Sequence, residues 1–302
     1  MQLGMIGLGK MGANMSERLI RGGHEVVGYD LNPESIERLV AIGARGAASL
    51  ADLVDRLAAP RVVWIMIPHG APVDTTIEAL RPLLDQGDIV IDGGNSFYKE
   101  SARRHAECAA AGHHFVDVGT SGGVWGLAEG YSMMVGGDAD VVATLRPLFE
   151  TLAPAPDKGW GHMGPAGSGH FVKMVHNGIE YGIMQAYAEG FAILEAKEEF
   201  GLDLAAAGKV WQYGSVIRSW LLDLTVNALD DNPSMSGIAP HVPDSGEGRW
   251  TVAESIDLDV AAPVITHSLL ARIGSRDDIG FSHRLLSAMR NQFGGHSIKR
   301  EE

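Results

Sequence analysis

Short apolar runs alternate with amphipathic stretches through the first half of the chain. The apolar runs fit strands at residues 2–6, 25–29, 61–67, 88–92, 114–118 and 131–135. The stretches between them, among them 13–21, 73–84 and 138–149, carry their apolar positions at helical spacing. Strands that alternate with helices predict a parallel, doubly wound α/β sheet.

From residue 168 onward the apolar positions recur only at helical spacing. The pattern predicts helices over 171–199, 205–212, 220–228, 252–258, 262–273 and 281–290, with a loop over 232–247. A glycine-rich joint at 160–169 separates the two patterns. We therefore expect an α/β domain at residues 1–163, followed by an all-α domain at 164–302.

The longest predicted helix carries polar groups on one face. Lys173, His176, Asn177, Glu180 and Tyr181 stand three or four residues apart, so they share a stripe. The apolar side chains on the other side, which should pack, are Phe171, Val172, Met174, Val175, Ile179 and Ile183. Residues 183–194 are nearly uncharged, which is typical of a buried helix. A lysine and a glutamate usually lie on a solvated face, but on a buried helix they need partners or a function.

Composition limits the number of domains, the partners and the location that we expect for this protein. A chain of 302 residues with 45% apolar and 21% charged residues favours two globular domains. The net charge of −14 disfavours nucleic acids and anionic membranes as partners. The single Cys108 excludes an internal disulfide and a cysteine metal cluster, and no metal site is expected. Since neither a signal-like opening nor a bilayer-length apolar run is present, we expect a cytoplasmic protein.

A glycine-rich turn follows the first predicted strand. Gly7-Leu8-Gly9-Lys10-Met11-Gly12 has the GxGxxG spacing, with a strand before it and a helix after it. Gly7 allows the tight turn, Gly9 lets the backbone approach a pyrophosphate, and Gly12 lets helix and strand pack closely. The context predicts a Rossmann-type, dinucleotide-binding α/β domain.

The end of the second predicted strand bears on the choice of cofactor. Asp30 can accept hydrogen bonds from the adenosine ribose and would repel a 2′-phosphate. Leu31 and Asn32 offer no arginine to hold that phosphate. We expect NAD rather than NADP, although Asp30 could also cap the helix that begins at Pro33.

Three further loops follow predicted strands, where ligands of such sheets bind. The first holds Ile67, Pro68 and His69, and the second holds Asn95. Ser121, Gly122 and Gly123 lie in the third, whose free amides suit a carboxylate or a phosphate. A flexible turn without a ligand is the alternative. Near the end, Arg272 and the Arg290…His296 segment are cationic, and such residues are usually solvated.

These motifs together resemble the decarboxylating 6-phosphogluconate dehydrogenases, most closely their short bacterial form, over nearly the whole chain. The glycine turn is shared by all β-hydroxyacid dehydrogenases, whereas Asp92-Gly93-Gly94-Asn95-Ser96 and Ser121-Gly122-Gly123 are more selective. The most specific matches are the segment from Lys173 to Tyr181 and the terminal Arg290…His296. Other β-hydroxyacid dehydrogenases have the lysine and a nearby asparagine, but not the His-Asn-x-x-Glu-Tyr set.

The resemblance implies an NAD-dependent oxidation of 6-phosphogluconate, with loss of CO2, in the pentose phosphate route. Lys173 would be the general base for the C3 hydroxyl, and Glu180 the acid that protonates C1, with Asn177 beside them. The implied substrate-binding residues are Asn95, Ser121, Gly122, Gly123, His176, Asn177, Tyr181, Arg272, Arg290 and His296. The implied cofactor-binding residues are the turn from Gly7 to Gly12, Asp30, Leu31, Ile67, Pro68, His69 and Asn95. A homo-oligomer, dimer or tetramer, would bring the terminal Arg290 and His296 to a neighbouring subunit's site.

One segment departs from the long-form family pattern. Ser245 and Glu247 stand where long-form enzymes carry a lysine and a threonine for the substrate phosphate. Glu247 would repel a dianionic phosphate, so either Arg249 compensates or the preference for phosphate is weaker.

Two other functions compete with this interpretation. The first is a non-decarboxylating β-hydroxyacid dehydrogenase, acting on 3-hydroxyisobutyrate or an aldonate, which would need neither Glu180 nor the cationic terminus. The second is a non-catalytic NAD-sensing protein, which would have no use for a buried base at Lys173.

Overall fold

The computed structural model describes residues 1–277, 280–294, 297 and 299. The chain forms two compact units, Met1–Gly178 and Ile179–Glu302. The division falls inside one long helix, α8 (Ser168–Ala196). The predicted domain boundary near residue 164 therefore stays a prediction.

The first unit contains one sheet with the strand order β3-β2-β1-β4-β5-β6-β7-β8. The strands are β1 (Gln2–Ile6), β2 (Glu25–Tyr29), β3 (Arg45–Gly46), β4 (Val62–Ile65), β5 (Ile89–Asp92), β6 (His114–Ser121), β7 (Ser132–Gly136) and β8 (Trp160–Gly164). Neighbouring strands are parallel except for β6 and β7, which are antiparallel. A parallel crossover needs a dozen or more residues, and the short connection between β6 and β7 cannot supply one. The expected parallel sheet therefore holds up to β6.

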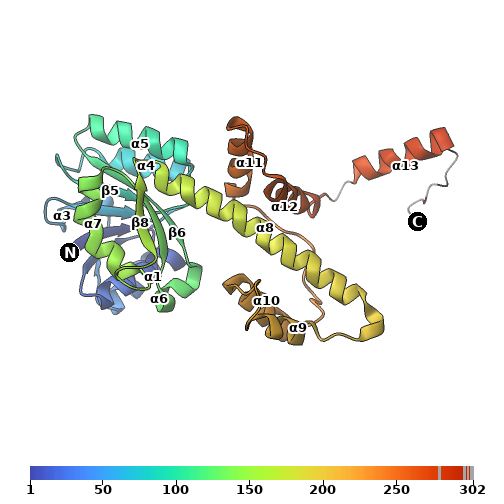
Figure 1. The fold of residues 1–302 in the computed structure, drawn as a ribbon. Helices are drawn as coiled ribbons and strands as arrows, with labels where there is room; N and C mark the ends of the chain where they lie inside the picture. Colours follow the sequence, from blue (N-terminus) through green and yellow to red (C-terminus); the bar gives the residue numbers. More distant parts are fainter. Residues whose placement is uncertain (278–279, 295–296, 298, 300–302) are drawn as a thin grey trace. The chain divides into compact units, whose positions relative to one another are not determined.

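Helices cover both faces of this sheet, as a doubly wound fold requires (Figure 1). They are α1 (Lys10–Arg21), α2 (Pro33–Ala41), α3 (Leu50–Asp55), α4 (Ala71–Leu80), α5 (Tyr98–Ala110), the 3₁₀ helix η1 (Gly123–Trp125), α6 (Gly126–Glu129) and α7 (Ala139–Leu152). One apolar layer joins α1 and α7 to the sheet, and the other joins α3, α4 and α5. Cys108 lies in the second layer, where burial raises the pKa of its thiol to about 11.

Helices are the only regular secondary structure among the described residues of the second unit. Its elements after α8 are η2 (Glu198–Phe200), α9 (Leu204–Trp211), α10 (Trp220–Asp231), α11 (Glu247–Asp257), α12 (Pro263–Gly274) and α13 (Phe281–Gly294). Phe191 of α8 packs with Leu222, Val226 and Leu229 of α10 and with Ala205 of α9. The predicted fold, an α/β Rossmann-type domain before an all-α domain, is confirmed. No helix among the described residues is long and apolar enough to cross a membrane.

Two sequence predictions were wrong in detail. Residues 160–164, interpreted as a joint, form strand β8, because their backbone pairs with β7 despite two glycines. The second half of α8 was expected to be buried, yet the side chains of Ile183 and Ile193 are 39% and 71% exposed. The apolar side of α8 is therefore packed only in part: Met174 is buried, whereas Ile179 and Ile183 are exposed.

Candidate active site

The glycine-rich turn between β1 and α1 leaves room for a ligand at the start of the helix. Gly7 has a φ of +90°, and a Cβ there would lie 2.4 Å from the Met66 carbonyl oxygen. A Cβ on Gly12 would lie 1.9 Å from the Gly7 carbonyl oxygen, so helix and turn touch there. A Cβ on Gly9 would meet no atom within 4 Å, and no side chain caps α1. Open amides at a helix N-terminus suit a pyrophosphate, so this turn fits a dinucleotide.

Asp30 is held against the same turn. Its Oδ2 accepts a hydrogen bond of 2.6 Å from the Leu8 N–H, and its Oδ1 accepts one of 2.8 Å from the Asn32 N–H. The carboxylate thus lies beside the turn, where an acid can meet an adenosine ribose. The alternative role of Asp30 as a helix cap is wrong, because Asn32 caps α2 by accepting from the Glu34 N–H. Leu31 is 90% exposed beside this carboxylate.

The loops after β4 and β5 lie next to each other, because these two strands pair. Pro68 and His69 are exposed in the first loop, after the half-buried Ile67. In the second loop, the buried carboxylate of Asp92 accepts hydrogen bonds from the Gly94 N–H (3.2 Å) and the Ser96 hydroxyl (2.7 Å). Asn95 lies between these two anchored residues.

Asn95 itself is exposed, whereas Gly94 and Ser96 are buried. The loop is therefore held firmly while it presents the Asn95 side chain outward.

The serine of the third predicted loop belongs to a strand. Ser121 is the last residue of β6, and the chain turns only at Gly122 and Gly123. Their φ values of +124° and +52° are ones that residues with side chains rarely adopt. The glycines are thus required by the turn itself, and Ser121 stands at the carboxyl end of β6.

Strand β6 fixes the start of α8. The fully buried Asp117 accepts hydrogen bonds from the backbone N–H groups of Gly167 (2.6 Å) and His170 (2.8 Å). Two residues further along β6, a Cβ on Gly119 would lie only 2.3 Å from the Cβ of Lys173. The helix therefore rests directly on β6 at Lys173, and a side chain at position 119 would push it away.

Lys173 is buried and held by a neighbour on its own helix. Its side chain is 6% exposed, and its Nζ donates a 2.7 Å hydrogen bond to Asn177 Oδ1. The same oxygen lies 3.0 Å from Nδ1 of the half-buried His176. Burial disfavours the charged form of a lysine, and a general base must be in the neutral form. The arrangement can take a proton from a substrate hydroxyl at a fixed position.

In the second unit, Tyr181 lies under a guanidinium group. The tyrosine is 5% exposed, and the Arg272 guanidinium carbon lies 3.5 Å from its ring centroid. Arg272 also donates to the Pro243 carbonyl oxygen at 3.1 Å. A Cβ on Gly248 would lie 2.5 Å from the Tyr181 ring, so α11 packs closely on it. The structure therefore brings Tyr181 and Arg272 together, and their role in binding a phosphate stays a prediction.

The first residue of α11 and the loop before it carry buried acidic side chains. The carboxylate of Glu247 is buried and accepts from the Ser245 hydroxyl at 2.5 Å. Among the described residues, its Oε1 has no hydrogen-bond partner. Arg249 is engaged elsewhere, because it pairs with Asp244, as Arg276 does. The hydrogen bond from Arg249, supported by Arg276, holds the pKa of Asp244 below its ordinary value.

The remaining predicted residues are more dispersed. Glu180 is half-buried on α8, one residue before Tyr181, and Arg290 is exposed on α13. His296 lies outside the described residues. The buried Asp117 and Arg104 were not among the predicted site residues. The only signal for Asp117 was a charged residue inside an apolar strand, and Arg104 had none.

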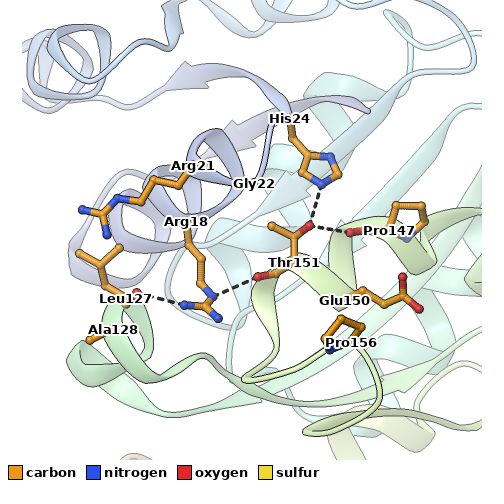
Figure 2. A pocket seen from close by; sticks show the side chains of 10 residues that line it. All are labelled: Arg18, Arg21, Gly22, His24, Leu127, Ala128, Pro147, Glu150, Thr151 and Pro156. Carbon is orange, nitrogen blue, oxygen red and sulfur yellow. Dashed lines mark hydrogen bonds between the residues drawn. The ribbon is translucent and has the colours of Figure 1, made fainter.

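A hollow of about 640 Å³ in the first unit lies away from the glycine turn of residues 7–12 (Figure 2). Arg18 and Arg21 belong to the last turns of α1, and His24 precedes β2, so the hollow lies at the amino-terminal end of β2. Arg18 donates to the carbonyl oxygens of Leu127, Thr151, Leu152 and Ala153. Its charge therefore serves helix ends rather than a ligand.

Comparisons with known proteins identify the family of both parts of the chain. Residues 2–164 match the family model described as "NAD binding domain of 6-phosphogluconate dehydrogenase". Residues 169–280 match that of "6-phosphogluconate dehydrogenase, C-terminal domain". No group of His, Cys, Asp or Glu within the described part of the chain is placed to hold a metal ion.

Two relatives match over all of both chains. One, from Bacillus subtilis (strain 168), is 45% identical and is called "Putative 6-phosphogluconate dehydrogenase YqeC". The other, from Haloferax volcanii, is 47% identical and is called "6-phosphogluconate dehydrogenase, NAD(+)-dependent, decarboxylating". A longer B. subtilis relative of the same description is 36% identical, over 89% of this chain and 60% of its own.

Solved structures show the same fold. The 6-phosphogluconate dehydrogenase of Plasmodium falciparum, solved in its apo form, with NADP+ and with 6-phosphogluconate, has a TM-score of 0.84 and 29% identity. The match covers 100% of this chain and 66% of the P. falciparum chain. A 3-hydroxyisobutyrate dehydrogenase of Mycobacterium tuberculosis has a TM-score of 0.74 at 24% identity and shows the fold alone.

Proposed function

The chain belongs to the 6-phosphogluconate dehydrogenase family, and we propose that it converts 6-phosphogluconate to ribulose 5-phosphate and CO2 with NAD as cofactor. The observation that carries the proposal is the buried Lys173, hydrogen-bonded to Asn177 on a helix that β6 fixes in place. A buried amine in the same unit as a dinucleotide-binding turn suits abstraction of a hydroxyl proton during hydride transfer. The full-length relatives named for this reaction support the substrate.

The cofactor assignment rests on Asp30 and the glycine turn. NAD, when bound, supplies the hydride acceptor. The Asp30 carboxylate is fixed by the Leu8 N–H and stands where a 2′-phosphate would need a cation. Leu31, fully at the surface, offers no such cation. This chemistry agrees with the NAD(+)-dependent relative from H. volcanii.

In the proposed reaction, Lys173 takes the proton of the C3 hydroxyl as the C3 hydride leaves. The resulting 3-keto acid loses its carboxylate as CO2, because the ketone accepts the electron pair. Glu180 then protonates C1 of the enediol. Seven residues at 1.5 Å each separate Lys173 from Glu180 along the helix, about 10 Å. Two groups at that spacing suit successive steps on different carbons.

Substrate contacts are proposed for both ends of the sugar acid. Asn95, Ser121, Gly122, Gly123, His176 and Asn177 would bind the carboxylate and hydroxyls, and Tyr181, Arg272, Arg290 and His296 the phosphate. The Glu247 carboxylate would repel a phosphate at its own position. Arg249 cannot offset that repulsion while it pairs with Asp244. The phosphate contacts in this chain therefore depend on the arginines at 272 and 290.

A homo-oligomer, dimer or tetramer, and a cytoplasmic location complete the proposal. Ile179, Ile183, Met184 and Ile193 expose apolar side chains along α8, as expected of a helix that another subunit covers. In such an assembly Arg290 and His296 would reach the neighbouring subunit's site. A cytoplasmic location follows from the charged cofactor and sugar phosphate, which do not cross membranes unaided.

The decisive assay follows NADH absorbance and released CO2 together, with NAD and 6-phosphogluconate. Both products in equal amounts are expected. NADH without CO2 would show a dehydrogenase that does not decarboxylate its substrate. Turnover of only gluconate or 3-hydroxyisobutyrate would refute 6-phosphogluconate as the substrate.

The residue roles are tested by Lys173→Met and Glu180→Gln. The first should abolish hydride transfer. The second should leave a burst of NADH but slow the steps after it, because C1 protonation comes last. Glu189→Gln is a matched control, since this exposed α8 glutamate accepts a hydrogen bond from Gln185, and the variant should turn over normally. An unchanged rate in Glu180→Gln would remove Glu180 from the mechanism.

A further inference from the structure

Arg104 is a buried arginine with no role in the proposed reaction. It lies on α5, and its side chain is only 1% exposed. Its guanidinium donates to carboxylate oxygens of Asp74 (2.8 Å), Asp92 (3.2 Å) and Glu100 (3.1 Å). It also donates to the Gly70 carbonyl oxygen at 3.2 Å. A guanidinium has five N–H donors in a fixed fork, and here the fork spans several elements at once.

One arm of the fork reaches the loop after β5. Asp92, the last residue of that strand, is fully buried. Its carboxylate also accepts hydrogen bonds from the Gly94 N–H and the Ser96 hydroxyl. Those two residues flank the exposed Asn95. Arg104 thus balances the charge of the carboxylate that shapes this loop.

Two other arms reach the segment after β4. Gly70 follows the loop of Ile67, Pro68 and His69, and has a φ of +83° where α4 begins. Asp74 lies in the first turn of α4. The guanidinium therefore ties the end of that loop to the start of the β5 loop.

We infer that Arg104 is a positioning residue for cofactor binding, which holds the β4 and β5 loops in the register that lets Asn95 and its neighbours meet the dinucleotide. The inference rests on the proposed function in one respect, namely that these loops contact NAD. It also goes further, because it assigns the placement of both loops to one side chain on α5 that touches neither ligand.

The same two strands supply a matched control at their other ends. Arg61, before β4, pairs with the buried Asp88, before β5, at 3.0 Å. This pair has the same chemistry, but it lies at the amino-terminal edge of the sheet, opposite the ligand edge. A purely structural role for Arg104 would make the two arginines equivalent.

The test compares Arg104→Lys with Arg61→Lys in the full chain. Lysine keeps the charge but cannot reproduce the fork. For each protein, the Kd for NADH, the KM for NAD, kcat and Tm are measured. Arg104→Lys should raise both the Kd and the KM about tenfold, because small misplacements of positioned groups are costly. Arg61→Lys should lower Tm comparably while Kd and KM stay within about twofold of the parent.

A double-mutant cycle with Asn95→Ala separates positioning from general destabilisation. If Arg104 acts through the Asn95 loop, Arg104→Lys should change the Kd for NADH much less in the Asn95→Ala background. Equal effects in both backgrounds, or an unchanged Kd in folded Arg104→Lys, would overturn the inference.

If Arg104→Lys does not fold, Ser96→Ala carries the test. It removes one hydrogen bond to Asp92 and leaves the ion pair intact. We expect about a threefold rise in the Kd for NADH, and an unchanged Kd would refute the inference. NADH binding needs no sugar acid, so a parent enzyme that ignores 6-phosphogluconate but binds NADH would fail the proposed function and leave this test valid.

Discussion

The contact between Gly119 and Lys173 can be tested by adding one methyl group. In Gly119→Ala, the new Cβ would lie 2.3 Å from the Lys173 Cβ and 2.9 Å from the Gly169 carbonyl oxygen. Carbon atoms rest at about 3.5–4.0 Å, so strand and helix must separate by roughly 1 Å. Both clashing atoms belong to the backbone or lie next to it, so a rotamer change cannot relieve them.

Two consequences of different size follow. Overpacking of this kind costs about 1–3 kcal/mol of unfolding free energy. A displacement of about 1 Å at a catalytic group can lower a rate by about 100-fold. We therefore expect Gly119→Ala to fold, with a modestly lower Tm, and to lose about two orders of magnitude in kcat. The KM for NAD should change little, because the glycine turn lies on other elements.

The assay pairs steady-state kinetics with urea unfolding, and Gly161→Ala is the control. That glycine lies on β8 of the same sheet, and its new Cβ would meet only the flexible end of the exposed Met163 side chain. It should keep both its kcat and its stability. A Gly119→Ala enzyme that retains more than half of the parental kcat would show that the position of Lys173 does not depend on β6.

Three further predictions concern other parts of the chain. Gly9→Ala should raise the Kd for NADH about tenfold without lowering Tm, whereas Gly12→Ala should lower Tm, because only the second Cβ would strike the backbone. Replacing Asp30 with Asn and Leu31 with Arg should move the kcat/KM ratio at least tenfold toward NADP, and unchanged NAD preference would contradict the assignment. Asp244→Asn should lower the unfolding free energy in urea at pH 7. The depressed pKa of Asp244 means that its contribution is present above the unfolded-state value, so the difference from the parent should shrink as pH falls below about 4, and a pH-independent difference would refute this.

Local patterns predicted the parts of the fold that local chemistry decides. The turn from Gly7 to Gly12 and the acid at Asp30 were predictable because backbone approach and strand ends impose residue types at fixed spacing. Strand β8 was missed because its glycines carry no apolar signal, and pairing with β7 decides its structure. The antiparallel course of β7 likewise depends on the short connection before it.

Which side chains of α8 are buried could not be predicted from helical spacing alone. Helical spacing grouped Lys173 with Asn177, and the hydrogen bond between them confirms it. It also assigned packing to the apolar side, where Met174 is buried but Ile179 and Ile183 are exposed. The structure nevertheless buries Lys173, because Gly119 offers a surface without a side chain on which Lys173 rests. Nothing near residue 173 in the sequence announces that glycine, since the contact joins distant segments.

The pairing of β5 with β6 explains why Asp117 and Arg104 are both buried with partners. Asp92 and Asp117 are paired positions on β5 and β6, and both are fully buried. Two neighbouring carboxylates in a medium of low dielectric repel strongly unless each has its own positive partner. Asp117 is offset by the N-terminal amides of α8, where the helix dipole is positive, and Asp92 by Arg104. The same pair of charges therefore requires both the start of α8, which places Lys173, and the guanidinium that ties down the Asn95 loop.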